Sequence, residues 1–172
     1  MEWSDRMIGM DIYTVSLFGH REINRPIMVA EKLEKIIRKL ISGKEYINFL
    51  IGRDGEFDII AASVIRRIIK ELDYGNASLT LVLPYMKAEY RDNEQEYLTY
   101  YDEVEICSQS SKAHFKAAIQ IRNKSMIDRS DLVIFFVERK QGGAYQSFRY
   151  AEQTGVRMIN IAECDAEWSE PL

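Results

Sequence analysis

Short apolar segments alternate with longer amphipathic segments along most of this chain, and this alternation constrains the fold more than any other feature of the sequence. Runs of β-branched and aromatic residues predict strands, whereas Ile and Leu at helical spacing predict helices. Their alternation is typical of a parallel sheet with right-handed crossovers and helices on both faces. We therefore predict an α/β fold, a Rossmann-like three-layer arrangement with a mainly parallel central sheet.

The expected elements follow from this pattern. The strands are residues 12–18, 46–51, 78–83, 104–107, 131–137 and 156–161, and the longer helices are residues 26–41, 57–72, 112–128 and 145–153. Ser110 or Ser111 is expected to cap the third of these helices. The segment 85–101 is rich in tyrosine and charge, and it is expected to form a loop with a short helix.

Length and composition predict a single domain. The chain has 172 residues, of which 47% are hydrophobic and 29% are charged, and this is enough to bury a substantial core. We expect a lead-in segment at residues 1–10, one domain at 11–164 and a C-terminal tail at 165–172. No apolar run approaches the roughly 20 residues that a membrane helix needs, so no membrane partner is expected.

Charge and cysteine content argue against several classes of function. The formal net charge is -4, whereas a general affinity for nucleic acid or anionic membrane needs clustered basic charge in excess. We therefore expect no nucleic-acid partner. Two cysteines without CxxC spacing and two histidines support neither a disulfide framework nor a zinc site. We expect a protein of the reducing cytoplasm with no metal and no cofactor.

The loops that follow the strands are the expected place for a ligand, because ligands of such sheets bind beyond the carboxyl ends of the strands. Residues 19–22, 52–58, 84–87 and 138–144 should converge there. Gly142 and Gly143 open a helix directly after a buried strand, where unpaired N–H groups at the helix N-terminus favour a phosphate. The alternative is a tight turn in which glycine supplies a positive φ.

The other candidate ligand-binding residues lie on the same loops or next to them, and each also has a purely structural interpretation. Asp54 or Asp58 is expected to accept hydrogen bonds from ribose hydroxyls or to hold Arg21, or else the acidic residues of this segment only stabilise a helix start. Arg122 is expected to reach a ligand phosphate or ribose, or else it is a solvated helix residue. The full set is Gly19, His20, Arg21, Gly52, Asp54, Gly55, Asp58, Arg122, Asn123, Gly142, Gly143, Ala144 and Tyr145.

Several features argue against common catalytic classes. Neither a GxGxxG fingerprint nor a GxxxxGK[ST] loop is present, so a standard dinucleotide dehydrogenase or P-loop NTPase is not expected. Cys107 and Cys164 have no evident base near them in the sequence, and His114 is expected on the surface or in packing. The tyrosines of segment 85–101 are expected to form a lid or a subunit contact.

Four segments together resemble a known superfamily. They are 16–21 (SLFGHR), 52–58 (GRDGEFD), 122–131 (RNKSMIDRSD) and 142–144 (GGA). The chain resembles the SLOG superfamily, the Rossmann-like group that includes the LOG cytokinin-activating phosphoribohydrolases and the DprA-type proteins, over most of its length. The resemblance implies a pocket for a nucleotide or nucleotide-derived ligand, with the glycine pair on the phosphate and Arg122 beside it.

The chain departs from the LOG pattern at the catalytic position. When the glycine pair is aligned with the LOG motif PGGxGTxxE, Gln141, Tyr145, Gln146 and Arg149 take the places of the proline, third glycine, threonine and catalytic glutamate. A carboxylate stabilises the oxocarbenium-like species of N-glycosidic cleavage, and a guanidinium in its place would oppose it. The departure therefore favours ligand binding over LOG-type hydrolysis.

Taken together, the sequence predicts a cytoplasmic protein that binds a nucleotide-derived ligand, such as ADP-ribose or NAD, as a sensor or sequestering protein. One alternative is a hydrolase of nucleotide N-glycosidic bonds that uses a carboxylate from segment 52–58. Another is a scaffold whose tyrosine-rich surface matters. A homo-oligomer, most simply a homodimer, is also expected.

Overall fold

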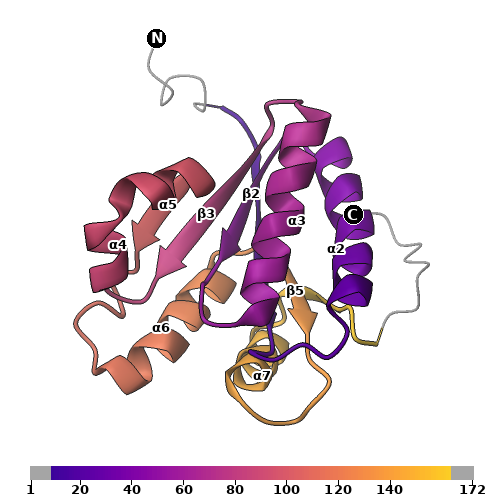
Figure 1. The fold of residues 1–172 in the computed structure, drawn as a ribbon. Helices are drawn as coiled ribbons and strands as arrows, with labels where there is room; N and C mark the ends of the chain where they lie inside the picture. Colours follow the sequence, from indigo (N-terminus) through magenta and orange to yellow (C-terminus); the bar gives the residue numbers. More distant parts are fainter. Residues whose placement is uncertain (1–8, 164–172) are drawn as a thin grey trace.

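A six-stranded, all-parallel sheet forms the centre of the molecule, in the order β4-β3-β2-β1-β5-β6 (Figure 1). The structure, a computed structural model, describes residues 9–163. The strands are β1 (Ile12–Gly19), β2 (Tyr46–Ile51), β3 (Ala77–Leu83), β4 (Glu103–Ile106), β5 (Leu132–Phe136) and β6 (Arg157–Asn160). The predicted α/β Rossmann-like fold is confirmed. Most of the lead-in at 1–10, all of the tail at 165–172, and Cys164 lie outside the described residues.

Helices cover both faces of this sheet. They are α2 (Pro26–Gly43), α3 (Glu56–Leu72), α4 (Ala88–Asp92), α5 (Glu94–Tyr100), α6 (Phe115–Asp128) and α7 (Gly143–Thr154). Successive side chains of a strand point to opposite faces of the sheet, so the buried residues form two clusters, one on each face. Val15 and Leu17 pack with α2 and α3 on one face, whereas Phe18 packs with α6 and α7 on the other. No helix in the described part of the chain is long and apolar enough to cross a membrane.

The strand order reverses at β1. The chain runs outward from β1 through β2 and β3 to β4, and then returns to place β5 on the other side of β1. Val15 of β1 is therefore paired with Phe49 of β2 and with Leu132 of β5. In parallel sheets a crevice opens at the carboxyl ends of the two strands where the order reverses. The fold thus places the loops after β1 and β5 at the edges of one crevice.

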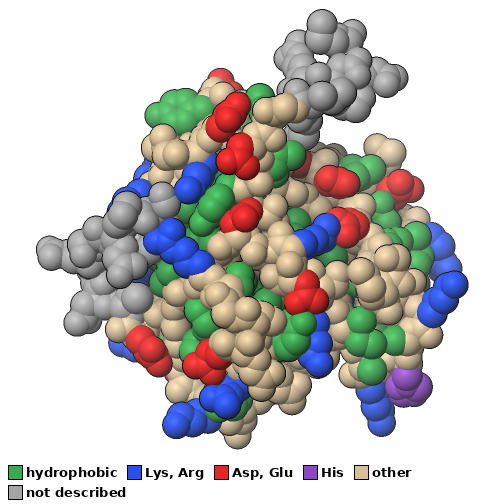
Figure 2. All heavy atoms as spheres, turned by 180° about the vertical axis from the view of Figure 1, so that it is seen from behind, with side chains coloured by type: hydrophobic (Ala, Val, Ile, Leu, Met, Phe, Trp, Pro, Cys, Tyr) green, Lys and Arg blue, Asp and Glu red, His purple; other side chains and the backbone are tan. Residues whose placement is uncertain are grey.

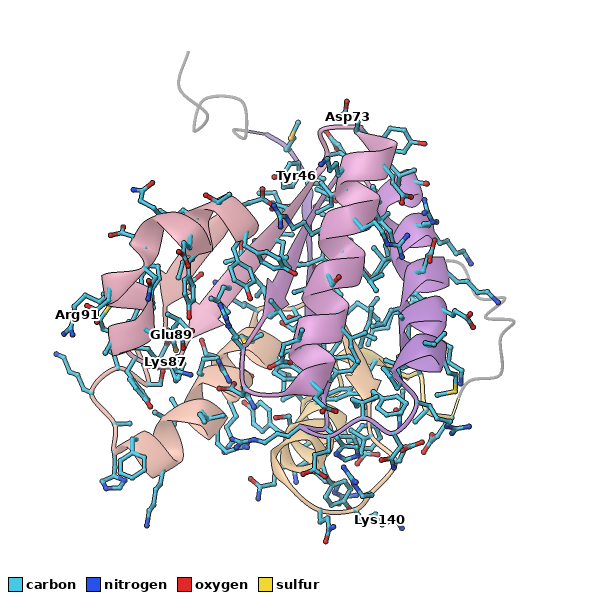
Figure 3. The ribbon with its side chains drawn as sticks, viewed as in Figure 1. Tyr46, Asp73, Lys87, Glu89, Arg91 and Lys140 are labelled. Carbon is cyan, nitrogen blue, oxygen red and sulfur yellow. The ribbon has the colours of Figure 1, made fainter. Side chains whose placement is uncertain are left out.

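The two ends of the sheet are distinct. Asp73, at the end of α3, and Tyr46, at the start of β2, lie at the upper end in Figure 3, whereas Lys87 and Lys140 lie toward the lower end. Charged side chains of both signs are scattered over the face of the molecule shown in Figure 2. The net charge of -4 is therefore the sum of many charges of both signs that lie close to one another.

The start of α6 differs from the prediction. Ser110 and Ser111 do not cap this helix; the cap is His114, whose Nδ1 accepts a hydrogen bond from the backbone N–H of Lys116 at 3.3 Å. Ser110 is fully buried instead, and its hydroxyl donates to the carbonyl oxygen of Pro84. Residues 107–114 therefore form a turn segment between β4 and α6.

The tyrosine-rich segment is also different from the prediction. It forms two short helices, α4 and α5, and Tyr90, Tyr97 and Tyr101 are 9%, 6% and 5% exposed in the same core as α2 and α3. The rings of Tyr90 and Tyr97 pack edge to face with centroids 5.3 Å apart. These three tyrosines are core residues, so the prediction of a lid or a subunit contact is wrong for them. The homo-oligomer stays a prediction.

Candidate functional site

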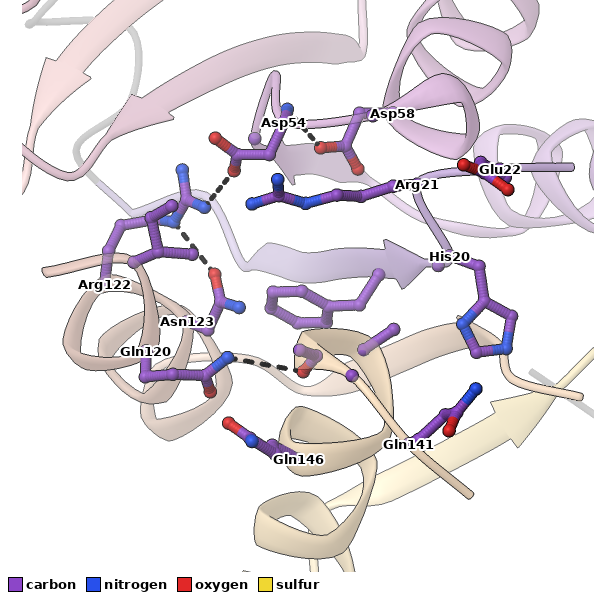
Figure 4. Close-up of a pocket in the computed structure, with 18 of the residues that line it drawn as sticks. His20, Arg21, Glu22, Asp54, Asp58, Gln120, Arg122, Asn123, Gln141 and Gln146 are labelled. Atoms are coloured by element: carbon purple, nitrogen blue, oxygen red, sulfur yellow. Dashed lines mark hydrogen bonds and ion pairs between the residues drawn. The ribbon is translucent and has the colours of Figure 1, made fainter. Parts of the chain in front are cut away.

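A cavity of about 720 Å³ opens at the carboxyl ends of β1 and β5, where the strand order reverses (Figure 4). Its walls come from the loops after β1, β2 and β5, from one face of α6 and from the first turn of α7. Its volume is within the range of pockets that hold small molecules. The cavity is therefore the candidate site for a ligand.

Most of the residues predicted from the sequence line this cavity. Those that do are Gly19, His20, Arg21, Gly52, Asp54, Gly55, Asp58, Arg122, Asn123, Gly142, Gly143 and Ala144, whereas Tyr145 does not. The loop 84–87, which was expected to converge with the others, does not line the cavity either. The loop still affects the cavity, because Lys87 forms an ion pair with the lining residue Asp54, with Nζ 3.4 Å from Oδ1.

The cavity has further lining residues that were not among the named candidates. Glu22, Arg139 and Gln141 lie on loops that were expected to converge there. The prediction missed Phe18, Lys116, Ile119, Gln120 and Gln146. Lys116, Gln120 and Asn123 follow one another at spacings of four and three residues, so they share one face of α6. This spacing is a signal that the sequence contains, but only the tertiary structure shows that this face lines a cavity.

The start of α7 lies beside the cavity without a capping side chain among the described residues. Gly142 has φ 87 and ψ 179, a conformation that favours glycine. A Cβ on Gly143 would lie 3.1 Å from Gln120 Nε2, which itself donates to Gly143 O at 3.4 Å. The geometry of Gly142 agrees with the tight-turn interpretation. The N–H groups of the first turn have no partner within the helix, so phosphate binding stays a prediction.

Arg122 is a buried residue, with 3% of its side chain exposed, and it ties four parts of the fold together. Its Nη1 donates to Val82 O of β3 at 2.8 Å, and its Nε donates to Asn123 Oδ1 at 2.9 Å. Its Nη2 forms an ion pair with Asp54 on the loop after β2 (Figure 4). Asn123 in turn donates to Ser147 Oγ of α7 at 3.0 Å. Three guanidinium nitrogens are thus engaged inside the protein, and direct binding of a ligand by Arg122 stays a prediction.

The two carboxyl groups of the loop after β2 have pKa values shifted in opposite directions. Burial alone raises the pKa of Asp54, but Arg122, with help from Lys87, outweighs burial and lowers it below its ordinary value. Burial raises the pKa of Asp58 to about 6, although a hydrogen bond from the Asp54 N–H at 2.9 Å opposes this shift. Asp54 is therefore ionised near neutral pH, and Asp58 changes its charge close to neutral pH.

Asp58→Asn should make the protein more stable at pH 7 by roughly 1 to 3 kcal/mol. The folded state keeps the Asp58 proton up to about pH 6, whereas the unfolded state loses it near 3.8. The stabilisation from the protonated group is complete below 3.8 and is lost as the pH rises through about 6. An asparagine oxygen can still accept from the Asp54 N–H. Urea unfolding of both proteins between pH 4 and 7.5 measures the effect, and a difference that stays constant with pH would rule it out.

His20 holds two loops together. It is 6% exposed, and its Nε2 accepts hydrogen bonds from the backbone N–H groups of Glu138 at 3.0 Å and Arg139 at 3.2 Å. Burial lowers the pKa of His20, and the charge of Arg139 lowers it further. A neutral ring with its proton on Nδ1 satisfies both contacts. The structure therefore uses His20 to fix the loop that leads into α7.

Glycines let the loops approach each other closely. A Cβ on Gly55 would lie 2.5 Å from Arg21 Cα, and the adjacent Glu56 N–H donates to Arg21 O at 2.9 Å. A Cβ on Gly52 would lie 3.0 Å from Arg122 Nη1 and 3.1 Å from Asp54 Oδ2. These glycines let neighbouring parts of the chain pack closely in the cavity wall.

Three basic side chains at the cavity form no ion pair with a carboxylate among residues 9–163, although the charge of Arg21 acts on the nearby Asp58. They are Arg21 from the loop after β1, Lys116 from α6 and Arg139 from the loop after β5. All three are exposed, and the uncapped start of α7 contributes further positive potential to the same cavity. The cavity is therefore suited to an anion.

Arg149 lies away from the cavity. It is 57% exposed, pairs with Glu152 at 3.1 Å, and is absent from the cavity lining. Its guanidinium therefore does not oppose positive charge on a ligand in the cavity, and that part of the argument against hydrolysis is wrong. The lack of a carboxylate at position 149 of α7 still argues against LOG-type hydrolysis.

Two comparisons with known proteins find no relative: no family model matches the chain, and no curated protein sequence matches it. Solved structures do match. DNA processing protein A (DprA) from Streptococcus pneumoniae superposes with a TM-score of 0.62 at 14% identity, over 86% of this chain and 49% of that one. The chain has the fold of DprA. The predicted likeness to DprA-type proteins is thus confirmed at the level of the fold, and the chain spans about half the length of the S. pneumoniae protein.

A second DprA structure bears on the expected partners. DprA from Helicobacter pylori superposes with a TM-score of 0.58 at 17% identity, over 94% of this chain and 72% of that one. The H. pylori protein has a single-stranded DNA binding mode. The expectation of no nucleic-acid partner is therefore wrong. This expectation rested on the net charge of -4, which sums the charges of the whole chain. A protein binds nucleic acid through local clusters of basic side chains, and the net charge does not report on such clusters.

Proposed function

We propose that the cavity binds a nucleotide or nucleotide-derived ligand by its phosphate, and that the protein acts as a sensor or sequestering protein in the cytoplasm. The observation that carries the proposal is the convergence of Arg21, Lys116 and Arg139, none of them paired with a carboxylate within residues 9–163, on a cavity beside the uncapped start of α7. Backbone N–H groups at a helix start and basic side chains are the usual partners of a phosphate. Cys107 is a free thiol, as suits a reducing compartment.

The rest of the cavity supports a ligand larger than phosphate alone. Gln120, Gln141 and Gln146 line its lower side in Figure 4 and offer amide donors and acceptors. Asp54 and Asp58 lie on the opposite side. This distribution favours a phosphate linked to a polar group such as a nucleoside, and ADP-ribose and NAD are candidates of this kind.

The proposal predicts that such a ligand stabilises the protein. A ligand at about 100 times its Kd should raise the Tm by roughly 5 to 10 °C. AMP, ADP-ribose, NAD, cyclic AMP and a short single-stranded oligodeoxynucleotide form a suitable panel for thermal unfolding. The oligodeoxynucleotide distinguishes a free nucleotide from a nucleic-acid strand, because DprA of the same fold binds single-stranded DNA.

Matched charge reversals locate the binding. Arg139→Glu should weaken binding of the best ligand at least tenfold, because it replaces a cation of the cavity with an anion. Arg91→Glu is the control, since Arg91 is an exposed arginine of α4 that does not line the cavity (Figure 3). If no member of the panel shifts the Tm, or if both variants lose binding equally, the proposal fails.

A hydrolase of nucleotide N-glycosidic bonds is the second candidate, and the opposite pKa shifts of Asp54 and Asp58 favour it. An acid with a raised pKa beside a carboxylate that stays ionised is the pairing that glycoside hydrolysis uses. Asp58 would protonate the leaving base as the C1′–N bond breaks, water would supply the oxygen that bonds to C1′, and the proton that this water loses would return to Asp58. Chromatography of incubated nucleotides decides: free base that disappears with Asp58→Asn supports hydrolysis, and intact nucleotide rejects it.

A further inference from the structure

Asp58 differs from the neighbouring Asp54 because one of its oxygens is free. Its Oδ2 accepts from the Asp54 N–H at 2.9 Å, and no other hydrogen bond to the carboxyl group is formed by the described residues. Both oxygens of Asp54 are engaged, Oδ2 by Arg122 and Oδ1 by Lys87 at 3.4 Å. Glu22 is exposed at the rim. Asp58 therefore offers an oriented hydrogen-bond acceptor to whatever occupies the cavity.

The position of Asp58 fixes which part of a ligand it can meet. Figure 4 shows Asp58 and Asp54 on one side of the cavity, and Gln146, from the first turn of α7, on the other. A phosphate held at the start of α7 therefore directs the attached sugar across the cavity, toward Asp58. In a nucleoside 5′-phosphate, the far side of this sugar carries the 2′- and 3′-hydroxyls.

We propose that Asp58 binds the vicinal 2′- and 3′-hydroxyls of a ribose, so that the cavity selects ribonucleotides over deoxyribonucleotides. The proposal rests on the proposed function, because the phosphate position determines where the sugar lies. A carboxylate with one oxygen held by a backbone N–H keeps lone pairs on both oxygens for two adjacent hydroxyl donors. The ligand class is then a 5′-phosphorylated ribose with both hydroxyls free, either a free nucleotide or the 3′-terminal nucleotide of an RNA strand.

Loss of one hydroxyl should matter strongly at such a site. A binding site built to accept a hydrogen bond from a hydroxyl discriminates against the analogue that lacks it, because the buried acceptor is left without a partner. A hydrogen bond to a charged group at a partly buried position corresponds to roughly a tenfold to hundredfold change in affinity. We expect AMP to bind at least tenfold more tightly than 2′-deoxy-AMP.

The preference should also depend on pH. The ionised carboxylate accepts hydrogen bonds from both hydroxyls, and Asp58 loses its proton as the pH rises through about 6. The charged or titratable groups that face it are Asp54 on its own loop, Arg21 from the loop after β1, Arg122 from α6, and Tyr101 after α5. Of these, Asp54 has a lowered pKa and Tyr101 a pKa raised to about 12, so neither titrates between pH 5 and 7.5. The ratio of the two affinities should therefore increase over that interval.

Isothermal titration with AMP and 2′-deoxy-AMP tests the proposal in the wild-type protein, in Asp58→Asn and in Glu22→Gln. Glu22→Gln is the matched control, because it neutralises the exposed carboxylate at the rim of the same cavity. We expect a ratio of at least ten in the wild type and in Glu22→Gln, and a ratio below about three in Asp58→Asn. Thermal unfolding of Asp58→Asn confirms that the variant is folded.

The outcomes separate this inference from the proposed function. If AMP and 2′-deoxy-AMP bind the wild type equally well, the ribose inference is overturned while phosphate binding stands. The ribose inference is also overturned if the ratio in Asp58→Asn equals that of the wild type. If neither compound binds at millimolar concentration, the proposed function and the inference that rests on it both fail.

Discussion

Arg122→Ala should lower the free energy of unfolding by about 3 to 5 kcal/mol, the cost of breaking a buried ion pair by removal of one partner. The change leaves the Asp54 carboxylate without its main counter-charge, and it leaves Val82 O and Asn123 Oδ1 without their donor. The Arg122 side chain is 3% exposed, so little water can replace these contacts. Urea unfolding measures the loss.

A second arginine provides the control for this experiment. Arg38 pairs with Glu34 at 2.9 Å and also with Glu71, but its side chain is 35% exposed. Arg38→Ala should cost less than about 1 kcal/mol, because exposed ion pairs contribute little. Removal of Asp54 together with Arg122 should recover part of the loss, since no unpaired charge then remains. A loss for Arg122→Ala no larger than that for Arg38→Ala would show that the buried network is not a main support of the cavity.

Gly19→Ala should cost about 3 kcal/mol, for a purely steric reason. A Cβ at this position would lie 2.2 Å from Cγ of Phe57, well inside van der Waals contact. Phe57 is fully buried and stacks on Phe136 with ring centroids 6.3 Å apart, so it cannot move aside without disturbing the core. The last residue of β1 must therefore be glycine.

Gly43→Ala is the matched control for this prediction. Nothing lies within 4 Å of a Cβ at Gly43, which is the last residue of α2. Alanine there should change the stability by less than about 1 kcal/mol, and it should stabilise the protein if it changes it at all. A second substitution, Phe57→Leu, should recover part of the loss in Gly19→Ala by making room for the new methyl group. Equal stabilities for Gly19→Ala and Gly43→Ala would contradict the steric account.

The fold was predictable because its signal is local. The strand Tyr46–Ile51 has the predicted bounds, and Pro26, which begins α2, is also the predicted first residue of that helix. The α6 start was not predictable in the same way, because Ser110 is a good capping residue that instead bonds to Pro84, 26 positions earlier. Local propensity cannot indicate a partner at such a distance.

The candidate site was predictable in outline only. The rule that ligands bind where strand order reverses gave four loops, of which those after β1, β2 and β5 line the cavity and the loop 84–87 after β3 does not. The rule says nothing about helix faces, so Lys116 and Gln120 of α6 were missed. It also cannot reveal that Arg149, on the helix that the glycine pair opens, is turned toward Glu152 and away from the cavity.

The assignment of ligand-contacting roles to polar side chains is where sequence reasoning was weakest. His20 was expected to meet the ligand, but its Nε2 already accepts two backbone N–H groups. Arg122 was expected beside a phosphate, but three of its nitrogens are engaged within the protein. Both side chains line the cavity and hold its walls together, and binding of a ligand by either of them stays a prediction.

The central claim is that a nucleotide phosphate binds at the start of α7, and a ¹H–¹⁵N NMR titration with AMP tests it most directly. The backbone N–H groups of Gly143, Ala144 and Tyr145 have no partner within the helix, so their signals should show the largest changes. Gly143→Asp, which places a carboxylate at this helix start, should abolish these changes. Signals that do not move at millimolar AMP, or changes confined to the edge strand β4, would contradict the account.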